Sequence, residues 1–281
     1  MIKVSIVTVT YNAGARLTRT ADSVLAQTYP CVEHIIIDGA STDDTIERAR
    51  HYQFVSSEAG SGHEVTITSE PDDGIYDAMN KGLAKATGDY IVFLNAGDTL
   101  PDPSTIRQVV GVARIPHRRF VDPDTAPKYA KIAELPAVDK EEPLPGIIYG
   151  DTDIVDENGT FLRHRRLTPP KSGLTWRSFK AGMLVCHQAF YARADIGKAC
   201  TYDTSYSFSA DVDWCIRVMK TAEQQGLTLR NAHAVLANYL AQGLTTENHR
   251  ASLVERFKVM RAHYGLVTTV MRHISFIFRA L

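Results

Sequence analysis

The chain has 281 residues, 44% of them hydrophobic, which is enough for one packed domain with an appendage. Its 31 Lys and Arg against 32 Asp and Glu give a formal net charge of −1, so no overall field favours a nucleic-acid partner. The four cysteines form no CxxC pair and no metal-ligand spacing, which is typical of reduced thiols in a cytosolic protein. The first residues have a strand pattern, so we expect no signal peptide, and no apolar run reaches the ~18 residues of a membrane span.

Short apolar runs alternate with helical patterns through the first hundred residues. The expected strands cover residues 4–9, 34–37, 65–68 and 90–94, and the expected helices cover residues 15–27, 45–51 and 75–86. This alternation predicts an α/β fold with a mainly parallel, doubly wound sheet flanked by helices. Gly88 is expected to be the C-cap of the helix before the fourth strand.

The pattern changes after the fourth strand. Residues 115–146 hold six of the twelve prolines and little periodicity, so we expect an irregular insertion there. A strand over 147–149, a hairpin turn at 157–159 and a helix that starts near Ser209 or Asp211 and ends near Gln225 are expected to follow.

The end of the chain has a different pattern. We expect one domain over residues 1–265 and an amphipathic, basic C-terminal helix over residues 266–281. That helix could lie on an anionic membrane surface, or it could pack on the domain or on a partner in a homodimer.

Polar side chains follow the first two expected strands. Thr10, Tyr11 and Asn12 end the first strand, and Asp38 ends the second. Ligands of open α/β sheets bind beyond the carboxyl ends of the strands, so we expect a nucleotide site here. Tyr11 could stack on a base, and Asp38 could accept a hydrogen bond from an imide N–H or a ribose hydroxyl. The alternatives are a packed Tyr11 and an Asp38 that forms a turn and a helix cap.

A polar cluster surrounds the start of the helix over 75–86. Asp72 precedes this helix, and Asp77, Asn80 and Lys81 lie on one of its faces. The face could be solvated and stabilised by an Asp77–Lys81 pair. Asp72 and Asn80, with Lys81 beside them, are the better candidates for the nucleotide site, because a helix N-terminus and a strand end meet there.

Asp98 follows the fourth strand, where a divalent cation would bridge two phosphates. Carboxylate oxygens suit Mg²⁺ or Mn²⁺, although Asn95 and Gly97 occupy flanking positions that could have been acidic.

Further along the chain, Asp211 and Asp213 open a helix, where acids often serve only as caps. Beside a nucleotide-sugar site, one of them could be the general base for an acceptor hydroxyl.

His187 and Gln188 follow an apolar strand pattern and could reach the phosphates or the acceptor. A histidine buried in the core is the alternative for His187.

Together these segments resemble an inverting family 2 glycosyltransferase with the GT-A fold, over roughly residues 4–226 apart from the insertion. The resemblance is carried by VSIVTVTYNAG, EHIIIDGASTDDT, DGIYDAMNKGLAKATGDYIVFLNAGD, CHQAFYARA and SADVDWCIRV. It implies a nucleotide-contacting turn at Thr10, Tyr11 and Asn12, base recognition by Asp38, and donor binding by Asp72 and Asn80. It also implies that Asp98 is the last acid of a DxD-type metal motif. Asp211 would be the catalytic base, with Ala210 where a Glu usually stands, and Asp213 would be the acid two positions on.

The resemblance implies transfer of a sugar from a nucleotide-diphosphate sugar to an acceptor hydroxyl, with inversion and with the help of a divalent metal. The expected acceptor is a glycan or a lipid-linked saccharide in cell-surface polysaccharide synthesis. The expected location is the cytoplasm or the inner face of the cytoplasmic membrane.

Two other classes of protein share parts of this pattern. A dinucleotide-dependent oxidoreductase would also be α/β, but no GxGxxG follows the first strand. A non-catalytic nucleotide-sugar-binding or scaffold protein could keep the same fold, and turnover or slow hydrolysis of a donor sugar would distinguish it from an enzyme.

Overall fold

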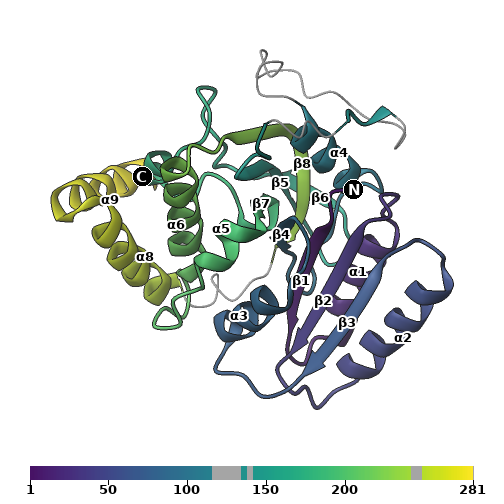
Figure 1. The fold of residues 1–281 in the computed structure, drawn as a ribbon. Coiled ribbons are helices and arrows are strands. Elements are labelled where there is room, and N and C mark those ends of the chain that lie inside the picture. The colour runs from purple at the N-terminus through teal and green to yellow at the C-terminus, as the bar shows by residue number, and fades with distance from the viewer. Residues whose placement is uncertain (116–133, 138–141, 242–248, 281) are drawn as a thin grey trace.

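The computed structural model describes residues 1–115, 134–137, 142–241 and 249–280. Within them, eight strands form one sheet (Figure 1). The strands are β1 Val4–Thr10, β2 Val32–Asp38, β3 Glu64–Ser69, β4 Tyr90–Phe93, β5 Ile147–Val155, β6 Phe161–His164, β7 Phe190–Arg193 and β8 Leu229–Leu240. Their order is β3-β2-β1-β4-β7-β5-β6, and β8 pairs with β5.

The sheet is parallel in its first half and mixed in its second. The strands β1 to β4 run parallel, as expected, whereas β7 is antiparallel to both β4 and β5. The parallel strands β1, β2 and β4 are buried along their whole length, which explains their unbroken apolar runs. The prediction of a mainly parallel sheet is therefore confirmed, because β5 and β8 are also parallel and antiparallel pairing is confined to the ladders of β6 and β7.

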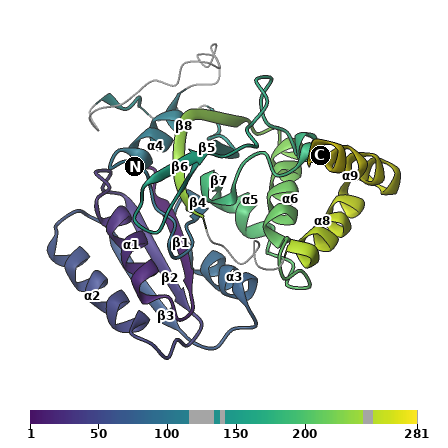
Figure 2. The same cartoon turned by 180° about the vertical axis from the view of Figure 1, so that it is seen from behind.

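Helices cover both faces of the parallel half. They are α1 Gly14–Leu25, α2 Thr45–Glu58 and α3 Ile75–Lys85. Helices α1 and α2 pack together over one face, and α3 contacts β1 and β2 on the other, as the two opposite views show (Figures 1 and 2). The alternation of expected strands and helices is thus confirmed, but α3 has its C-cap at Ala86. Gly88 is not a C-cap: a Cβ there would lie 2.6 Å from Ser5 Oγ, so glycine lets the chain pass close to β1.

The second half of the chain adds the elements that complete the site. They are α4 Thr105–Arg114, the 3₁₀ helices η3 Trp176–Ala181 and η4 His187–Ala189, α5 Ala194–Ala199 and α6 Ala210–Gln224. The expected hairpin turn is present between β5 and β6, where Gly159 has a φ of 83°. The greater part of the expected insertion over 115–146 lies outside the described residues.

The chain ends in two helices, α8 His249–Tyr264 and α9 Leu266–Ala280. They pack on each other, α8 also contacts α6, and α9 contacts η3. Both lie at the edge of the molecule that is remote from β1, β2 and β3 (Figures 1 and 2). No helix in the described ranges is long and apolar enough to cross a membrane.

Candidate active site

The loops after β1 and β2 are joined through Asn12. Asn12 has a φ of 47°, a left-handed conformation that asparagine tolerates better than most residues. Its Oδ1 accepts a hydrogen bond from the Thr42 N–H at 2.9 Å, and its own N–H donates to Ser41 Oγ at 2.8 Å. Asn12 therefore shapes the turn that carries Tyr11, whose side chain is 64% exposed. Thr10 lies buried just before this turn.

Asp38 is fully buried at the end of β2. Its Oδ2 accepts hydrogen bonds from the Ser41 N–H at 2.9 Å and the Ser69 hydroxyl at 2.7 Å, and its Oδ1 accepts one from the Ser41 hydroxyl. A carboxylate enclosed in this way holds the loop and presents little to a ligand. Base recognition by Asp38 stays a prediction, and these contacts favour the alternative of a turn-forming aspartate.

The side chains of Tyr11 and Asp72 both lie close to Gly39, which has no side chain of its own. A Cβ on Gly39 would lie 2.5 Å from Asp72 Oδ2 and 3.4 Å from Tyr11 Cδ2, so the glycine leaves these two side chains their room. Asp72 Oδ1 accepts a hydrogen bond from the Gly74 N–H at 2.9 Å, which fixes the carboxylate. The pair offers an exposed ring for stacking and a carboxylate that can accept from an N–H or a hydroxyl.

The polar side-chain atoms of Asn80 and Lys81 form hydrogen bonds and an ion pair with other groups of the protein. The Asn80 amide bonds both backbone groups of Tyr202, donating to its carbonyl at 2.9 Å and accepting from its N–H at 2.7 Å. Lys81 Nζ donates to the Pro71 carbonyl at 2.8 Å and lies 3.2 Å from Asp77, the pair that the sequence offered as an alternative. The structure therefore gives both residues a part in holding the loop around Asp72 and the segment at Tyr202.

Asp98 and Gln188, predicted for different roles, bond each other. Gln188 Nε2 donates to Asp98 Oδ2 at 2.7 Å, and the Leu240 N–H at the end of β8 donates to Asp98 Oδ1 at 2.9 Å. Burial raises the pKa of Asp98 to about 6, although these hydrogen bonds act in the opposite direction. Asp98 thus links the loop after β4 to η4 and to the end of β8.

The residues near Asp98 do not form a divalent metal site as they stand. Both Asp98 oxygens are engaged, and Asn95 and Gly97 occupy positions where acids would extend a ligand set. Among the described residues, no three His, Cys, Asp or Glu side chains gather closely enough to hold an ion. Asn95 Oδ1 is buried without a hydrogen-bond partner in the same ranges, but one amide oxygen is a poor substitute for the carboxylates that Mg²⁺ sites use.

His187 connects the end of β4 to the start of α6. Its Nε2 lies 3.4 Å from Asn95 Nδ2, and its Nδ1 lies 3.3 Å from Asp211 Oδ2. The second contact has the length of an ion pair, but its geometry is not that of a hydrogen bond, so Nδ1 still lacks a full partner within the described structure. The structure therefore brings Asn95, His187 and Asp211 together, although they come from three separate segments.

The surroundings of Asp211 keep its carboxyl group ionised. Burial pushes the pKa of Asp211 upward, but His187 and the nearby Arg256 outweigh it and hold this pKa below its ordinary value. Tyr76 donates its hydroxyl to Asp211 Oδ1 at 3.5 Å. A carboxylate that is ionised at neutral pH and oriented from two sides can accept a proton from a bound hydroxyl.

Asp213 faces away from this group. Its Oδ2 accepts from Arg217 Nε at 2.6 Å, and its Oδ1 lies 2.7 Å from His263 Nε2 on α8. Burial raises the pKa of Asp213, but these two partners lower it by more. The arrangement separates the two acids: Asp211 faces His187 and Tyr76, whereas Asp213 joins α6 to α8.

Two residues of this site were missed by sequence reasoning. Tyr76 lies within the segment GIYDAMN, but an aromatic residue at a helix start normally indicates packing. Arg256 lies on α8, far along the chain, and no sequence signal connects it with Asp211. Its Nε is buried and makes no hydrogen bond within the described residues.

Comparisons with known proteins identify the family and the fold. A family profile for Glycosyl transferase family 2 matches residues 5–197. A PGL/p-HBAD biosynthesis glycosyltransferase of Mycobacterium bovis is 30% identical over 240 residues, which cover 84% of this chain and 75% of that protein. An uncharacterized glycosyltransferase of Mycobacterium tuberculosis is 41% identical over 108 residues, or 38% of each chain.

Solved structures share the fold at low sequence identity. TarS of S. aureus in complex with UDP-GlcNAc has a TM-score of 0.64 at 14% identity, and the match covers 93% of this chain and 65% of that one. Glucosyl-3-phosphoglycerate synthase of Mycobacterium tuberculosis, in complex with Mn²⁺, UDP and glucosyl-3-phosphoglycerate, has a TM-score of 0.55 at 16% identity over 94% of this chain and 81% of that one. The chain has the mixed α/β fold of GT-A glycosyltransferases, and it belongs to glycosyltransferase family 2.

Proposed function

We propose that this glycosyltransferase moves a sugar from a nucleotide-diphosphate sugar to an acceptor hydroxyl with inversion at the anomeric carbon. The observation that carries the proposal is the position of Asp211, an ionised carboxylate at the start of α6 that contacts His187 and Tyr76 beside the end of β4. Only one carboxylate in this group is available as a base. A single general base is what direct displacement requires, because no covalent intermediate forms.

The donor nucleotide would bind at the loops after β1 and β3. Its base would stack on the exposed ring of Tyr11, and the Asp72 carboxylate would accept from a base N–H or a ribose hydroxyl. The diphosphate would then extend past the end of β4 towards Asn95 and His187, which places the anomeric carbon on the side of Asp211.

The reaction would proceed as one displacement. The acceptor hydroxyl gives its proton to Asp211 as its oxygen attacks the anomeric carbon, while the bond from that carbon to the phosphate oxygen breaks and its electron pair leaves with the nucleotide diphosphate. His187 orients Asp211 through Nδ1, and Asn95 in turn positions the ring through Nε2. The positive charge of Arg256 would favour the ionised base.

Metal assistance remains an expectation drawn from the family. Solved relatives contain Mn²⁺ or Mg²⁺ together with a nucleotide. The side chains near Asp98 do not fit a divalent ion in their present arrangement, so no step of the proposed reaction depends on one.

The acceptor is proposed at the level of chemical class. A relative named for PGL/p-HBAD biosynthesis supports a biosynthetic acceptor, and we propose a glycan or a lipid-linked saccharide of the cell surface. The main alternative is a protein that binds nucleotide sugars without turning them over.

The test uses donor turnover, which requires no known acceptor. The protein is incubated with UDP- and GDP-sugars, and proton NMR follows the anomeric configuration of sugar released by slow hydrolysis or transferred to added acceptors. We expect the configuration opposite to that of the donor. Retention of configuration would exclude the single displacement, and nucleotide binding without any turnover would favour the non-catalytic alternative.

A further inference from the structure

Helix α9 turns its apolar side away from the protein. Five large apolar side chains of α9 lie on one helical face with exposed fractions between 40% and 75%: Leu266, Val267, Val270, Met271 and Ile274. The opposite face carries Thr269, which is buried, and His273, whose ring contacts Phe257 of α8. Within the described residues, packing on its own domain therefore does not cover the apolar stripe.

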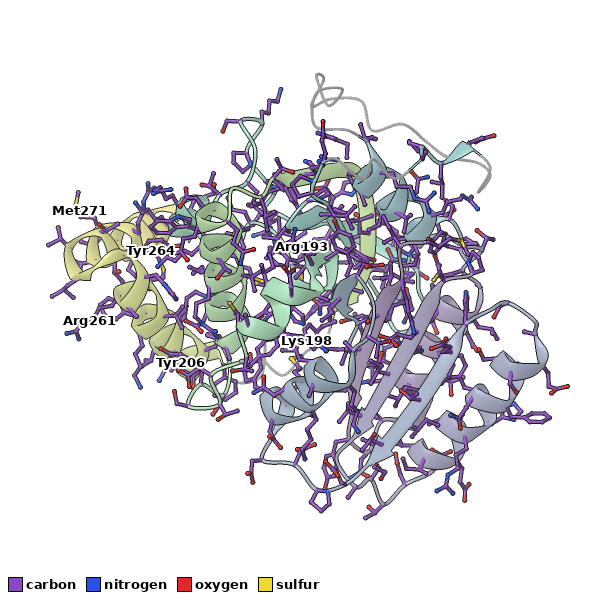
Figure 3. The ribbon with its side chains drawn as sticks, in the orientation of Figure 1. Arg193, Lys198, Tyr206, Arg261, Tyr264 and Met271 are labelled. Carbon is purple, nitrogen blue, oxygen red and sulfur yellow. The ribbon has the colours of Figure 1, made fainter. Side chains whose placement is uncertain are left out.

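Helix α8 is divided in the same way. Its inner face holds His263 against Asp213 and places Arg256 near Asp211. Its outer face exposes Leu253 and Val254 together with three cationic residues, Arg250, Lys258 and Arg261. Arg261 of α8 and Met271 of α9 both project from the outer edge of the molecule, away from the sheet (Figure 3).

The charge of this region differs from that of the rest of the chain. Residues 249–281 contain six of the 31 Lys and Arg but one of the 32 Asp and Glu, so they carry a net charge of +5 and the remaining residues carry −6. The single acid, Glu255, faces the segment before α6, where it accepts hydrogen bonds from the Ser207 and Phe208 N–H groups at 2.9 and 2.7 Å.

We propose that the outer face of α8 and α9, here termed the docking face, binds an anionic lipid membrane surface. The apolar stripe of α9 would enter the boundary between head groups and acyl chains, and Arg250, Lys258 and Arg261 would meet the lipid phosphates. Self-association is disfavoured, because two docking faces would bring Arg250, Lys258 and Arg261 of both copies together.

Docking would also orient the active site. The inner face of α8 is fixed to the start of α6 through the His263–Asp213 contact, and Asp211 lies in the same helical turn. A membrane held against the outer face would therefore lie on the side of the molecule that carries the general base. This consequence rests on the proposed function and suits a lipid-linked acceptor, whereas binding to lipid does not depend on catalysis.

The experiment measures flotation of the full chain with vesicles. One set contains phosphatidylcholine alone, and the other contains phosphatidylglycerol and phosphatidylcholine in about equal parts. We expect binding to the anionic vesicles only, weakening as salt is raised. Changing Arg250, Lys258 and Arg261 to Gln should lower the partition coefficient about fivefold for each charge removed. Val267→Ser with Met271→Ser should lower binding at every salt concentration.

Matched variants elsewhere control for general effects. Phe54→Ser removes an exposed apolar side chain from α2, and Lys85→Gln removes an exposed cation from α3; neither should change vesicle binding. Equal binding to both vesicle types, or no binding to either, would overturn the proposal without reference to any variant. Light scattering that shows a dimer disrupted by Val267→Ser with Met271→Ser would assign the face to a second copy. Donor hydrolysis measured without lipid tests the proposed function separately.

Discussion

His187 Nδ1 lies 3.3 Å from Asp211 Oδ2, close enough for the imidazole to set the proton affinity of the carboxylate. The two residues belong to different elements, η4 and α6, so the contact exists only in the folded chain. It gives Asp211 an oriented oxygen and a pKa below the ordinary range even though the group is buried.

The first prediction concerns the pH dependence of turnover. Asp211 must be deprotonated to act as a base, so turnover falls as pH drops through its pKa. His187→Gln removes the strongest influence that lowers this pKa, and burial then dominates. We expect the acid limb of kcat/KM for donor turnover to move to higher pH. The same limb in His164→Gln, which alters an exposed histidine, should stay in place; an unmoved limb in His187→Gln would contradict the role given to the imidazole.

The second prediction separates the two acids of α6. Asp211→Asn should reduce turnover by ~10²–10⁴-fold, as is typical when a general base is lost, with little effect on nucleotide binding. Asp213→Asn should instead lower the free energy of unfolding by about 1–3 kcal/mol, because it weakens the bonds that a buried carboxylate forms with Arg217 and His263.

The contribution of the Asp213 carboxylate to the free energy of unfolding is present above the ordinary pKa of Asp and is lost as pH falls through its lowered pKa. Denaturation by urea and donor turnover, measured on both variants, would show the reverse pattern if Asp213 were the base.

The third prediction concerns Asn80, which the sequence suggested as a donor-binding residue. Because its amide bonds both backbone groups of Tyr202, Asn80→Ala should lower the free energy of unfolding by about 1–3 kcal/mol and leave the Kd for UDP or GDP nearly unchanged. Calorimetric titration and urea denaturation provide the two measurements. A weaker nucleotide affinity at unchanged stability would restore the donor-binding role.

Sequence patterns predicted the parallel half of the sheet because β1, β2 and β4 are buried on both faces and their apolar runs stand out. The other half was harder to predict. The strand β7 pairs with β4, and β8 pairs with β5, across long stretches of sequence. No local sequence feature indicates whether such a pair is parallel or antiparallel.

The site shows the same division. The segments that hold Tyr11, Asp72 and Asp211 could be found from residue type and spacing. Whether a polar side chain faces a ligand or its own protein depends on distant backbone groups, such as the Leu240 N–H that engages Asp98. The spacing within FLNAGD could not reveal that contact.

The fourth prediction tests Asp98 as a metal ligand or as a structural residue. Because both of its oxygens bond Gln188 and the Leu240 backbone, we expect Asp98→Ala to weaken UDP or GDP binding by the same factor with Mn²⁺ present and with EDTA. It should also lower the melting temperature in both conditions. Isothermal titration of wild type and variant provides the comparison. A loss of affinity confined to the samples with Mn²⁺ would support a metal role and would mean that Asp98 leaves its present partners when donor binds.

The last prediction concerns recognition of the nucleotide base. Tyr11→Ala should weaken nucleotide binding by about 0.5–1.5 kcal/mol, the range of an aromatic stacking contact, and should leave stability unchanged because the ring is 64% exposed. When the affinities for UDP and GDP are compared, Asp72→Asn should weaken binding of the preferred nucleotide more than binding of the other. The reason is that an amide and a carboxylate form hydrogen bonds with different base edges. Phe54→Ala, at an aromatic residue of α2 that is 62% exposed, is the matched control and should change neither affinity. Full affinity in both Tyr11→Ala and Asp72→Asn would move the base away from Gly39 and return Asp38 to consideration, because it lies next along the same edge of the sheet.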